Sequence, residues 1–203
     1  GCDLAVCTVE LAASGVAMDG QGGFTELDSA ISVSTFVVGG STHAIVASDG
    51  DSGIQLVDVS DPSSPVAVGA AMDGQGGFTQ LGGAIGVSTF VVGGSTYAIV
   101  VSLYDDGIQL VDVSDPSSPV AVGAATDGQG GFTELDGAID VSTFVVGGST
   151  YAIVVAINDD GIQLVDVSDP SSPVAVGAAT DGQGGFTELD GAFGVSTFVV
   201  GSS

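Results

Sequence analysis

The stretch "STYAIVVAINDDGIQLVDVSDPSSPVAVGAAT" (149–180) decides the fold of this 203-residue chain. Its first part, 149–157, is β-branched and almost wholly apolar, as is typical of a strand that is covered on both faces. "NDDG" supplies a turn before a second strand, 162–168. The prolines of "DPSSP" end that strand because proline has no N–H for a β-ladder. With a further strand at 174–180, the stretch predicts three consecutive strands joined by short turns.

A fourth strand precedes these three. "AIDVSTFVV" (138–146) is followed by Gly147-Gly148, a dipeptide that provides the positive φ angles of a tight hairpin turn. A glycine-rich loop, "DGQGGFTELDG" (181–191), follows the last strand. No part of the chain has apolar residues at helical spacing without an interrupting Gly or Pro, so we expect no helix longer than one turn. The pattern predicts a four-stranded antiparallel meander.

This unit is repeated with a constant period. "DGQGGFT" begins at Asp19, Asp73, Asp127 and Asp181, which are 54 residues apart. We therefore expect an all-β fold, a β-propeller-like array of four-stranded antiparallel blades, with a β-solenoid as the alternative. The expected divisions are an N-terminal segment 1–18 with one strand at 11–18, complete repeats 19–72, 73–126 and 127–180, and a partial repeat 181–203 with its strand at 193–201.

The phrase "GIQLVDVSDPSSPVAVG", present in all three complete copies, resembles the LVIVD repeat. This family consists of propeller-type repeats in bacterial and archaeal surface or secreted proteins. The resemblance implies a propeller blade and a location outside the cytoplasm. It implies no activity, because the family has no shared catalytic residues to carry over.

Charge narrows the possible partners. The chain has 25 acidic residues and neither lysine nor arginine, which gives a net charge of −25. Such a field repels nucleic acid and anionic membranes, so we expect no nucleic-acid partner. Apolar residues make up 44% of the chain, too many for acidic disorder, yet no apolar run is long enough for a membrane span.

The meander predicts where the acids lie, because alternate connections fall at opposite ends of the strands. The glycine-rich loops and the turns between second and third strands share one end and hold most of the carboxylates. The opposite end holds the aspartates of the "VDVSDPSSP" corners, whose side chains we expect to fix turns by accepting backbone hydrogen bonds. These are Asp58, Asp61, Asp112, Asp115, Asp166 and Asp169.

The glycine-rich loops are candidate calcium sites, since each full loop has three acids within ten residues and calcium prefers oxygen ligands. The second copy has Gln80 and Gly82 where the third has Glu134 and Asp136, so we expect it to bind weakly or not at all. The alternative is a set of Asp-Gly turns in a protein adapted to salty water. The candidate ligands are Asp19, Glu26, Asp28, Asp127, Glu134, Asp136, Asp181, Glu188 and Asp190.

The sequence also allows predictions for the cysteines, the histidine and the phenylalanines. Cys2 and Cys7 are spaced for a disulfide, which indicates an oxidising compartment, although acylation of Cys2 is an alternative. His43 has tyrosine counterparts in the other copies and is expected to be a surface aromatic. Phe132 and Phe144 represent phenylalanines that we expect to pack between blades.

These features predict a structural extracellular or cell-surface protein that self-assembles into a filament, surface layer or adhesive scaffold. The homo-oligomer is expected to form through terminal strands, because three blades with two stray strands cannot close an ordinary propeller. The alternative is a calcium-dependent adhesion module whose acidic face binds glycans or other surface proteins. No nucleophile motif is present, so an enzyme is not expected.

Overall fold

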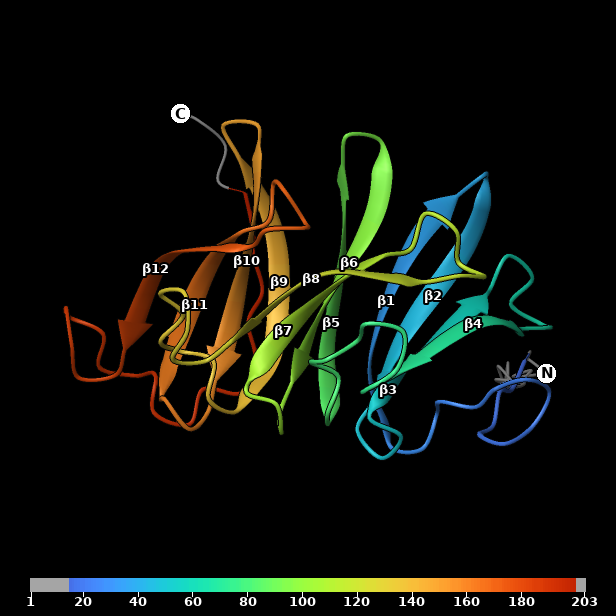
Figure 1. The fold of residues 1–203 in the computed structure, drawn as a ribbon, viewed down its shortest axis with the longest axis horizontal. Helices are drawn as coiled ribbons and strands as arrows, with labels where there is room; N and C mark the ends of the chain where they lie inside the picture. Colours follow the sequence, from blue (N-terminus) through green and yellow to red (C-terminus); the bar gives the residue numbers. More distant parts are fainter. Residues whose placement is uncertain (1–14, 200–203) are drawn as a thin grey trace, which may run out of the picture.

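The computed structural model describes residues 15–199, in which twelve strands form three four-stranded sheets (Figure 1). The first sheet contains β1 (Ala30–Val38), β2 (Ser41–Ser48), β3 (Gly53–Asp58) and β4 (Val66–Met72). The second contains β5 (Ala84–Val92), β6 (Ser95–Ser102), β7 (Gly107–Asp112) and β8 (Val120–Thr126). The third contains β9 (Ala138–Val146), β10 (Ser149–Ala156), β11 (Gly161–Asp166) and β12 (Val174–Thr180).

Each sheet is the predicted antiparallel meander, with its strands in chain order. The first and second strands are joined by a Gly-Gly turn, such as Gly39-Gly40 with φ angles of 61° and 85°. Two successive positive φ angles are typical of the hairpin turn that matches the twist of the flanking strands. The described residues contain no helix, and the four strand limits expected in the third copy are correct to within two residues.

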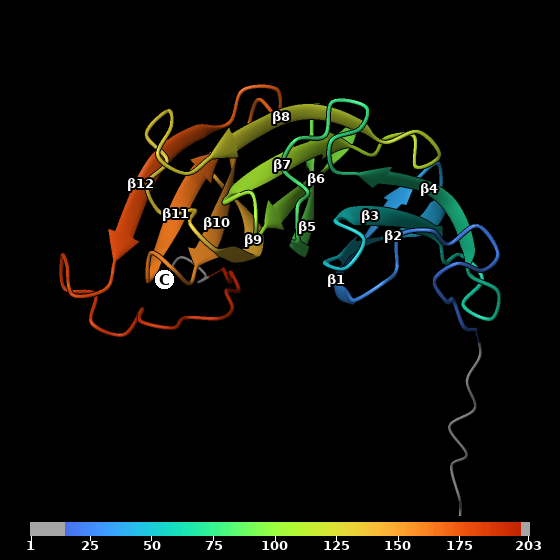
Figure 2. The same cartoon turned by 60° about the horizontal axis from the view of Figure 1, so that its bottom comes forward.

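The three sheets stand side by side in an arc (Figure 2). The first strands β1, β5 and β9 lie on the concave side, and the fourth strands β4, β8 and β12 lie on the convex side. Every ladder of strand pairing stays within one sheet. This is a blade arrangement, and the alternative of a β-solenoid is wrong.

Apolar side chains fill the space between neighbouring sheets. Ile45 and Leu56 of the first sheet belong to one cluster with Val100 and Val111 of the second sheet and with Phe78 of the loop before it. A second cluster joins the second and third sheets in the same way. The middle sheet is therefore covered on both faces, as its near-continuous apolar second strand predicted.

A buried glutamine in each third strand ties the glycine-rich loop to the sheet. In the second sheet the Gln109 side chain is 1% exposed, and its Oε1 accepts the N–H of Thr79 at 3.0 Å. Its Nε2 donates to the carbonyl of Gly123 in β8 at 2.8 Å. Gln55 and Gln163 make the equivalent contacts. A buried amide with all of these bonds holds the loop in one conformation.

Candidate functional site

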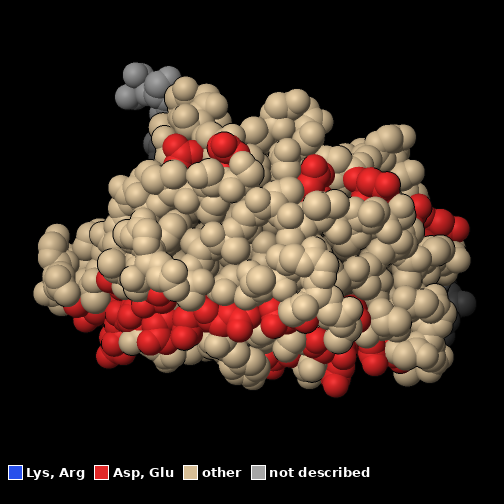
Figure 3. Space-filling view, in the orientation of Figure 1, with Lys and Arg blue, Asp and Glu red and all other residues tan. Residues whose placement is uncertain are grey.

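The acids segregate as the meander predicted. Figure 3 shows a nearly continuous red band along the end formed by the glycine-rich loops and the turns between second and third strands. Smaller acidic groups lie at the opposite end, and the surface has no blue because the chain has no Lys or Arg. We call the red band the acidic end. Its charge has no counter-charge within the chain, so neighbouring carboxylates repel one another.

One position at the acidic end joins each sheet to the next. Asp106 has a φ angle of 52°, unusual for a residue with a side chain. Its Oδ1 accepts the N–H of Gly137, and its carbonyl accepts the N–H of Asp127, both in the loop before the third sheet. Ser52 and Asp160 make the equivalent contacts. These turn residues thus fix blade spacing, a role that sequence analysis missed.

The loop carboxylates also accept hydrogen bonds within the loop and from the neighbouring turn. Asp127 Oδ1 accepts the N–H of Leu135 at 3.1 Å, and Asp159 Oδ2 accepts the N–H of Asp136 at 2.8 Å. Asp136 Oδ1 in turn accepts a hydrogen bond from Asn158 at 2.8 Å. These hydrogen bonds order the loop.

Two glutamates of the acidic end are buried. Glu134 is 7% exposed and Glu26 is 4% exposed. Glu134 Oε1 accepts the hydroxyl of Thr180 at 2.6 Å, whereas its Oε2 is buried without a hydrogen-bond partner. The same oxygen of Glu26 is also unpaired. Both carboxylates lie against a glycine, Gly161 and Gly53, where a Cβ atom would collide with them.

Burial and mutual repulsion change the protonation of this region. The pKa of Asp159 is raised from 3.8 to about 6. Burial is the largest cause and the charges of Asp127, Glu134 and Asp136 add to it, whereas the hydrogen bond from the Asp136 N–H opposes the rise. Burial and the charge of Asp51 likewise raise the pKa of Glu26. The folded chain at neutral pH therefore holds carboxylates that would be more stable with a proton or a cation.

The predicted calcium ligands do not form a ready-made cage. Within residues 15–199, no group of three or more His, Cys, Asp and Glu side chains is placed to hold a metal ion. Asp19, Asp127 and Asp181 each accept a loop N–H, while Glu188 and Asp190 are exposed. Calcium binding at the acidic end stays a prediction, and it would require these side chains to move.

At the opposite end the aspartates fix turns. Asp61 Oδ1 accepts both the N–H and the hydroxyl of Ser63, at 2.9 and 2.6 Å. The Ser63 hydroxyl and N–H lower the pKa of Asp61, and Asp115 and Asp169 have the same arrangement with their own serines. Asp58 Oδ1 accepts the N–H of Ser60. This confirms the turn-fixing interpretation for these corners.

His43 is not on the surface, so that expectation was wrong. It is 8% exposed and stacks on Phe36 with ring centroids 5.6 Å apart, as Tyr97 stacks on Phe90. The position does hold an aromatic ring in every copy, histidine in the first and tyrosine in the others. It lies inside each sheet, however, where the first strand pairs with the second. Phe132 packs between the second and third sheets as expected.

The outer face of the third sheet is open. Ile45, Ile54 and Leu56 of the first sheet are 0% exposed, and so are their counterparts in the second sheet, because the next sheet covers them. The third-sheet counterparts are only half-buried; they are Ile153, Ile162 and Leu164. Phe186, in the loop over this face, is 46% exposed, whereas Phe132 is 5% exposed.

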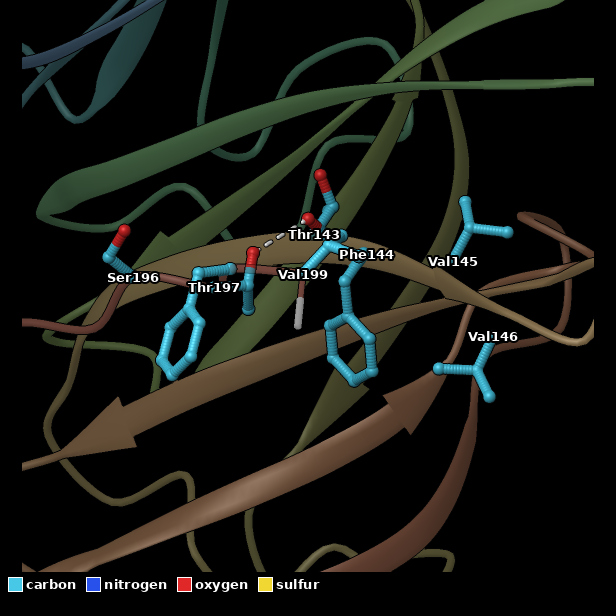
Figure 4. A pocket seen from close by; sticks show the side chains of 8 residues that line it. Thr143, Phe144, Val145, Val146, Ser196, Thr197 and Val199 are labelled. Carbon is cyan, nitrogen blue, oxygen red and sulfur yellow. Dashed lines mark hydrogen bonds between the residues drawn. The ribbon is translucent and has the colours of Figure 1, made fainter. Parts of the chain in front are cut away.

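A groove lies at the concave side of this open end (Figure 4). It runs between β9 and residues 192–199, which we call the C-terminal segment, and its volume is about 620 Å³. Phe144 and Phe198 both line this groove, and the hydroxyls of Ser142 and Thr197 lie 3.0 Å apart. The open groove is lined by Thr143, Phe144, Val145, Val146, Ser196, Thr197, Phe198 and Val199.

The structure describes only part of the two strands that were expected at 11–18 and 193–201. Of the predicted strand 11–18, the structure describes 15–18, which is not assigned as a strand. Gly15 packs against Pro62 and Pro65 as Gly69 packs against Pro116 and Pro119, so it occupies the place of a fourth strand. The C-terminal segment likewise lies where a first strand would lie, without regular pairing. Cys2 and Cys7 lie outside the described residues.

Across residues 15–199 the structure offers no long apolar helix that could cross a membrane.

The chain is similar to solved structures. A functionally unknown protein from Desulfotomaculum acetoxidans matches with a TM-score of 0.56 and 12% identity, over 82% of this chain and 46% of that chain. A protein from Lactobacillus plantarum matches with a TM-score of 0.49 and 12% identity, over 71% and 41%. The chain therefore spans less than half the length of either protein. The likeness to the Desulfotomaculum acetoxidans protein shows the all-β, propeller-like fold alone. No curated protein matches the chain.

The family model of the LVIVD repeat matches residues 43–73, 93–127 and 144–181. Each match covers the second, third and fourth strands of one sheet, and the three matches together cover just over half of the chain. The buried glutamine and the corner aspartates described above lie within these segments. On this evidence of sequence and fold, the chain belongs to the LVIVD repeat family.

Proposed function

We propose that this chain is a structural module of an extracellular or cell-surface protein, and that it works by joining further blades end to end. The observation that carries the proposal is the open face of the third sheet. Its isoleucines and leucine occupy positions that are fully covered wherever another sheet follows. These side chains are still partly exposed, and covering their remaining apolar surface is favourable by roughly 25 cal/mol per Å².

The interface between sheets is heterologous, because one face of a sheet meets the other face of the next. Such contacts propagate when further blades are available. Second copies of the chain are one source of such blades, and the proposal is tested on them. The large negative charge favours solubility of the exposed modules and a salt-rich setting outside the cell.

Light scattering in moderate salt tests the proposal, since salt screens the repulsion between acidic ends. The chain is expected to have a mass well above the 19.5 kDa of one copy. Leu164→Asp places a charge on the open face and is expected to lower the mass towards that of a monomer. A wild-type chain that stays monomeric at high concentration contradicts the proposal.

Val174→Asp is the matched control. Val174 is 53% exposed, and its counterparts Val66 and Val120 are each 52% exposed although other sheets follow them. This position therefore takes no part in blade contacts. The control is expected to assemble like the wild type, and a thermal melt of each variant checks that it folds.

A calcium-dependent binding module is the second candidate. The buried, unpaired carboxylate oxygens of Glu26 and Glu134 favour it, because they lie among other acids with no base in the chain. A divalent cation relieves such repulsion more effectively than a monovalent one. In this role the acidic end would present calcium to a glycan or a surface protein.

A further inference from the structure

A small groove lies between the first and second sheets. It is formed by the end of β4, by the glycine-rich loop that follows β4 and by one corner of the second sheet, and its volume is about 390 Å³. Met72 and Gln75, which line it, are exposed, so the groove opens to solvent. Most of its wall is apolar, and its lining includes Glu26, Ala70, Ala71, Met72, Phe78 and Pro119.

Glu26 is the charged residue of this groove, and one of its oxygens lacks a partner. The side chain is 4% exposed, and Oε2 is buried without a hydrogen bond. A Cβ atom on Gly53 would lie 2.7 Å from this oxygen and 2.7 Å from the carbonyl oxygen of Ala71, so two acceptors approach the same point. Burial of an acceptor without a donor is costly, and a cationic donor at this place would therefore stabilise the folded chain.

The chain has no base that could pair with this carboxylate, since it contains neither lysine nor arginine. Burial is the largest cause of the raised pKa of Glu26, and the charges of Asp51 and Asp19 add to it. A positive group beside Glu26 would be attracted by all three acids. A second copy of the chain has the same composition, so the positive group comes from outside this sequence.

The chemistry of the groove favours a lysine side chain. Lysine packs its aliphatic stem along apolar surface and carries a compact charge at the tip, which one free oxygen can accept. Arginine binds best to two free carboxylate oxygens, whereas a hydrogen bond with the Thr25 side chain already lowers the pKa of Glu26 and engages its carboxylate. Calcium needs six to eight oxygens, and a mostly apolar wall does not provide them.

The third copy repeats the arrangement. A groove of about 500 Å³ is lined there by Glu134, Ala178, Ala179 and Phe186, the counterparts of Glu26, Ala70, Ala71 and Phe78. Glu134 Oε1 accepts the hydroxyl of Thr180, and its Oε2 is again unpaired. The second copy has the neutral Gln80 at this position and is therefore a natural control.

We propose that the groove beside Glu26, and its counterpart beside Glu134, each bind a lysine side chain of a partner protein. The ammonium group binds the carboxylate, and the aliphatic stem lies along the alanines of the fourth strand. Because each groove contains a single charged residue, it recognises one side chain of a larger ligand. The inference goes beyond the proposed function, since the partner is a different protein and the groove beside Glu26 lies between the first two sheets.

The test is a nuclear magnetic resonance titration of the full chain, with labelled alanine methyl groups, in the presence of EDTA. The probe is Nα-acetyl-lysine N-methylamide, at constant ionic strength. We expect saturable shifts at Ala70, Ala71, Ala178 and Ala179, and none at Ala124 and Ala125, which occupy the equivalent places in the copy with Gln80. The norleucine derivative, which has the stem without the ammonium group, should cause no saturable shift, and the arginine derivative should bind more weakly.

Glu26→Gln is the decisive variant. It introduces the residue that the second copy already has, so the variant is expected to fold. Lysine binding at Ala70 and Ala71 should weaken at least tenfold, while binding at Ala178 and Ala179 should be unchanged. Asp28→Asn is the control, because it removes the same charge from an exposed position of the same loop and should bind like the wild type.

Absence of saturable shifts would overturn the inference, and so would equal binding of the norleucine derivative or of the Glu26→Gln chain. Equal shifts at Ala124 and Ala125 would also contradict it, because they would show attraction to the acidic end in general. The result is independent of self-assembly. A chain that stays monomeric in light scattering but binds the lysine derivative through Glu26 contradicts the proposed function and supports the lysine site, and an assembling chain that ignores the derivative does the reverse.

Discussion

The hydroxyls of Ser88 in β5 and Thr143 in β9 lie 3.0 Å apart and join the first strands of two neighbouring sheets. Ser34 and Thr89 make the same contact one sheet earlier, at 2.8 Å. Ser142 and Thr197 make it one sheet later, at 3.0 Å, where Thr197 belongs to the C-terminal segment. The same hydrogen bond thus places the C-terminal segment as the next first strand.

We predict that Thr143→Val destabilises the chain by about 1–2 kcal/mol. The substitution removes the bond to Ser88 and the one that Thr143 donates to the carbonyl of Thr89, and net hydrogen bonds contribute about 1 kcal/mol each. Chemical denaturation measures the change. The exposed Thr133 is the control, and its valine variant should be within about 0.5 kcal/mol of the wild type. Equal stability of both variants would show that the hydroxyl contacts contribute nothing.

We predict that Gly123→Ala is harmful and Gly177→Ala is not. A Cβ atom on Gly123 would collide with the carbonyl of Pro170 in the next sheet, which should cost about 1–3 kcal/mol. The equivalent Gly177 has no following sheet among residues 15–199, and its Cβ atom would lie 3.4 Å from Leu164. Thermal melting of the monomeric forms compares the two. A loss of the same size at Gly177 would mean that the collision with the next blade is not the cause.

We predict that Gln109→Leu costs roughly 2–3 kcal/mol although leucine is apolar and similar in size. The substitution leaves the N–H of Thr79 and the carbonyl of Gly123 without their buried partner. Gln129, which lies on the exposed part of the loop, is the matched control and should tolerate leucine. Denaturant unfolding gives both values. Faster proteolysis of the loop at 127–137 in Gln163→Leu, the equivalent variant of the third sheet, would support the same cause.

We predict that Asp159→Asn removes part of the pH dependence of stability. The pKa of Asp159 rises from 3.8 to about 6 on folding, so the folded state binds the proton more tightly. The resulting penalty is present above about pH 6 and disappears as pH falls from about 6 to about 4. The wild type should therefore gain stability relative to the variant as pH falls through this range.

Asp105→Asn is the control, because Gln80 replaces the acidic Glu134 in that copy. A constant difference between wild type and Asp159→Asn across this range would contradict the prediction.

We predict that millimolar calcium raises the melting temperature more than sodium does at equal ionic strength. Glu26→Gln and Glu134→Gln should each reduce the calcium effect, whereas Gln80→Leu, in the copy that lacks two of the acids, should not. Calorimetric titration provides a second readout. If calcium and sodium act alike, the acidic end responds only to general screening, and the calcium-dependent function is to be rejected.

Much of the fold could be predicted because local signals and the period agreed. The Gly-Gly turns separate first from second strands, and the "DPSSP" segments separate third from fourth strands. The apolar second strands lie between these signals, and the 54-residue period repeats the pattern. The meander then located the acids, since strand polarity alone decides which turns share an end. The blade stacking also followed, because a strand that is apolar on both faces needs a cover on both sides.

Contacts between distant residues could not be predicted from the local pattern. His43 was placed at the surface because tyrosines replace it in the other copies, whereas pairing with Phe36 buries it. Gln109 was missed, although a glutamine at one fixed place in an apolar strand was a usable signal. The role of Asp106 depends on a loop that begins 21 residues later in the chain, and no local pattern reports that.

The central claim is that the outer face of the third sheet is one half of a blade interface, and electron cryomicroscopy of the assembled chain tests it most directly. The account predicts strands of a further blade within about 4 Å of Ile153, Ile162 and Leu164, with the same packing that covers Ile99, Ile108 and Leu110. Assembled particles in which solvent covers these three side chains, with contacts elsewhere, would contradict it.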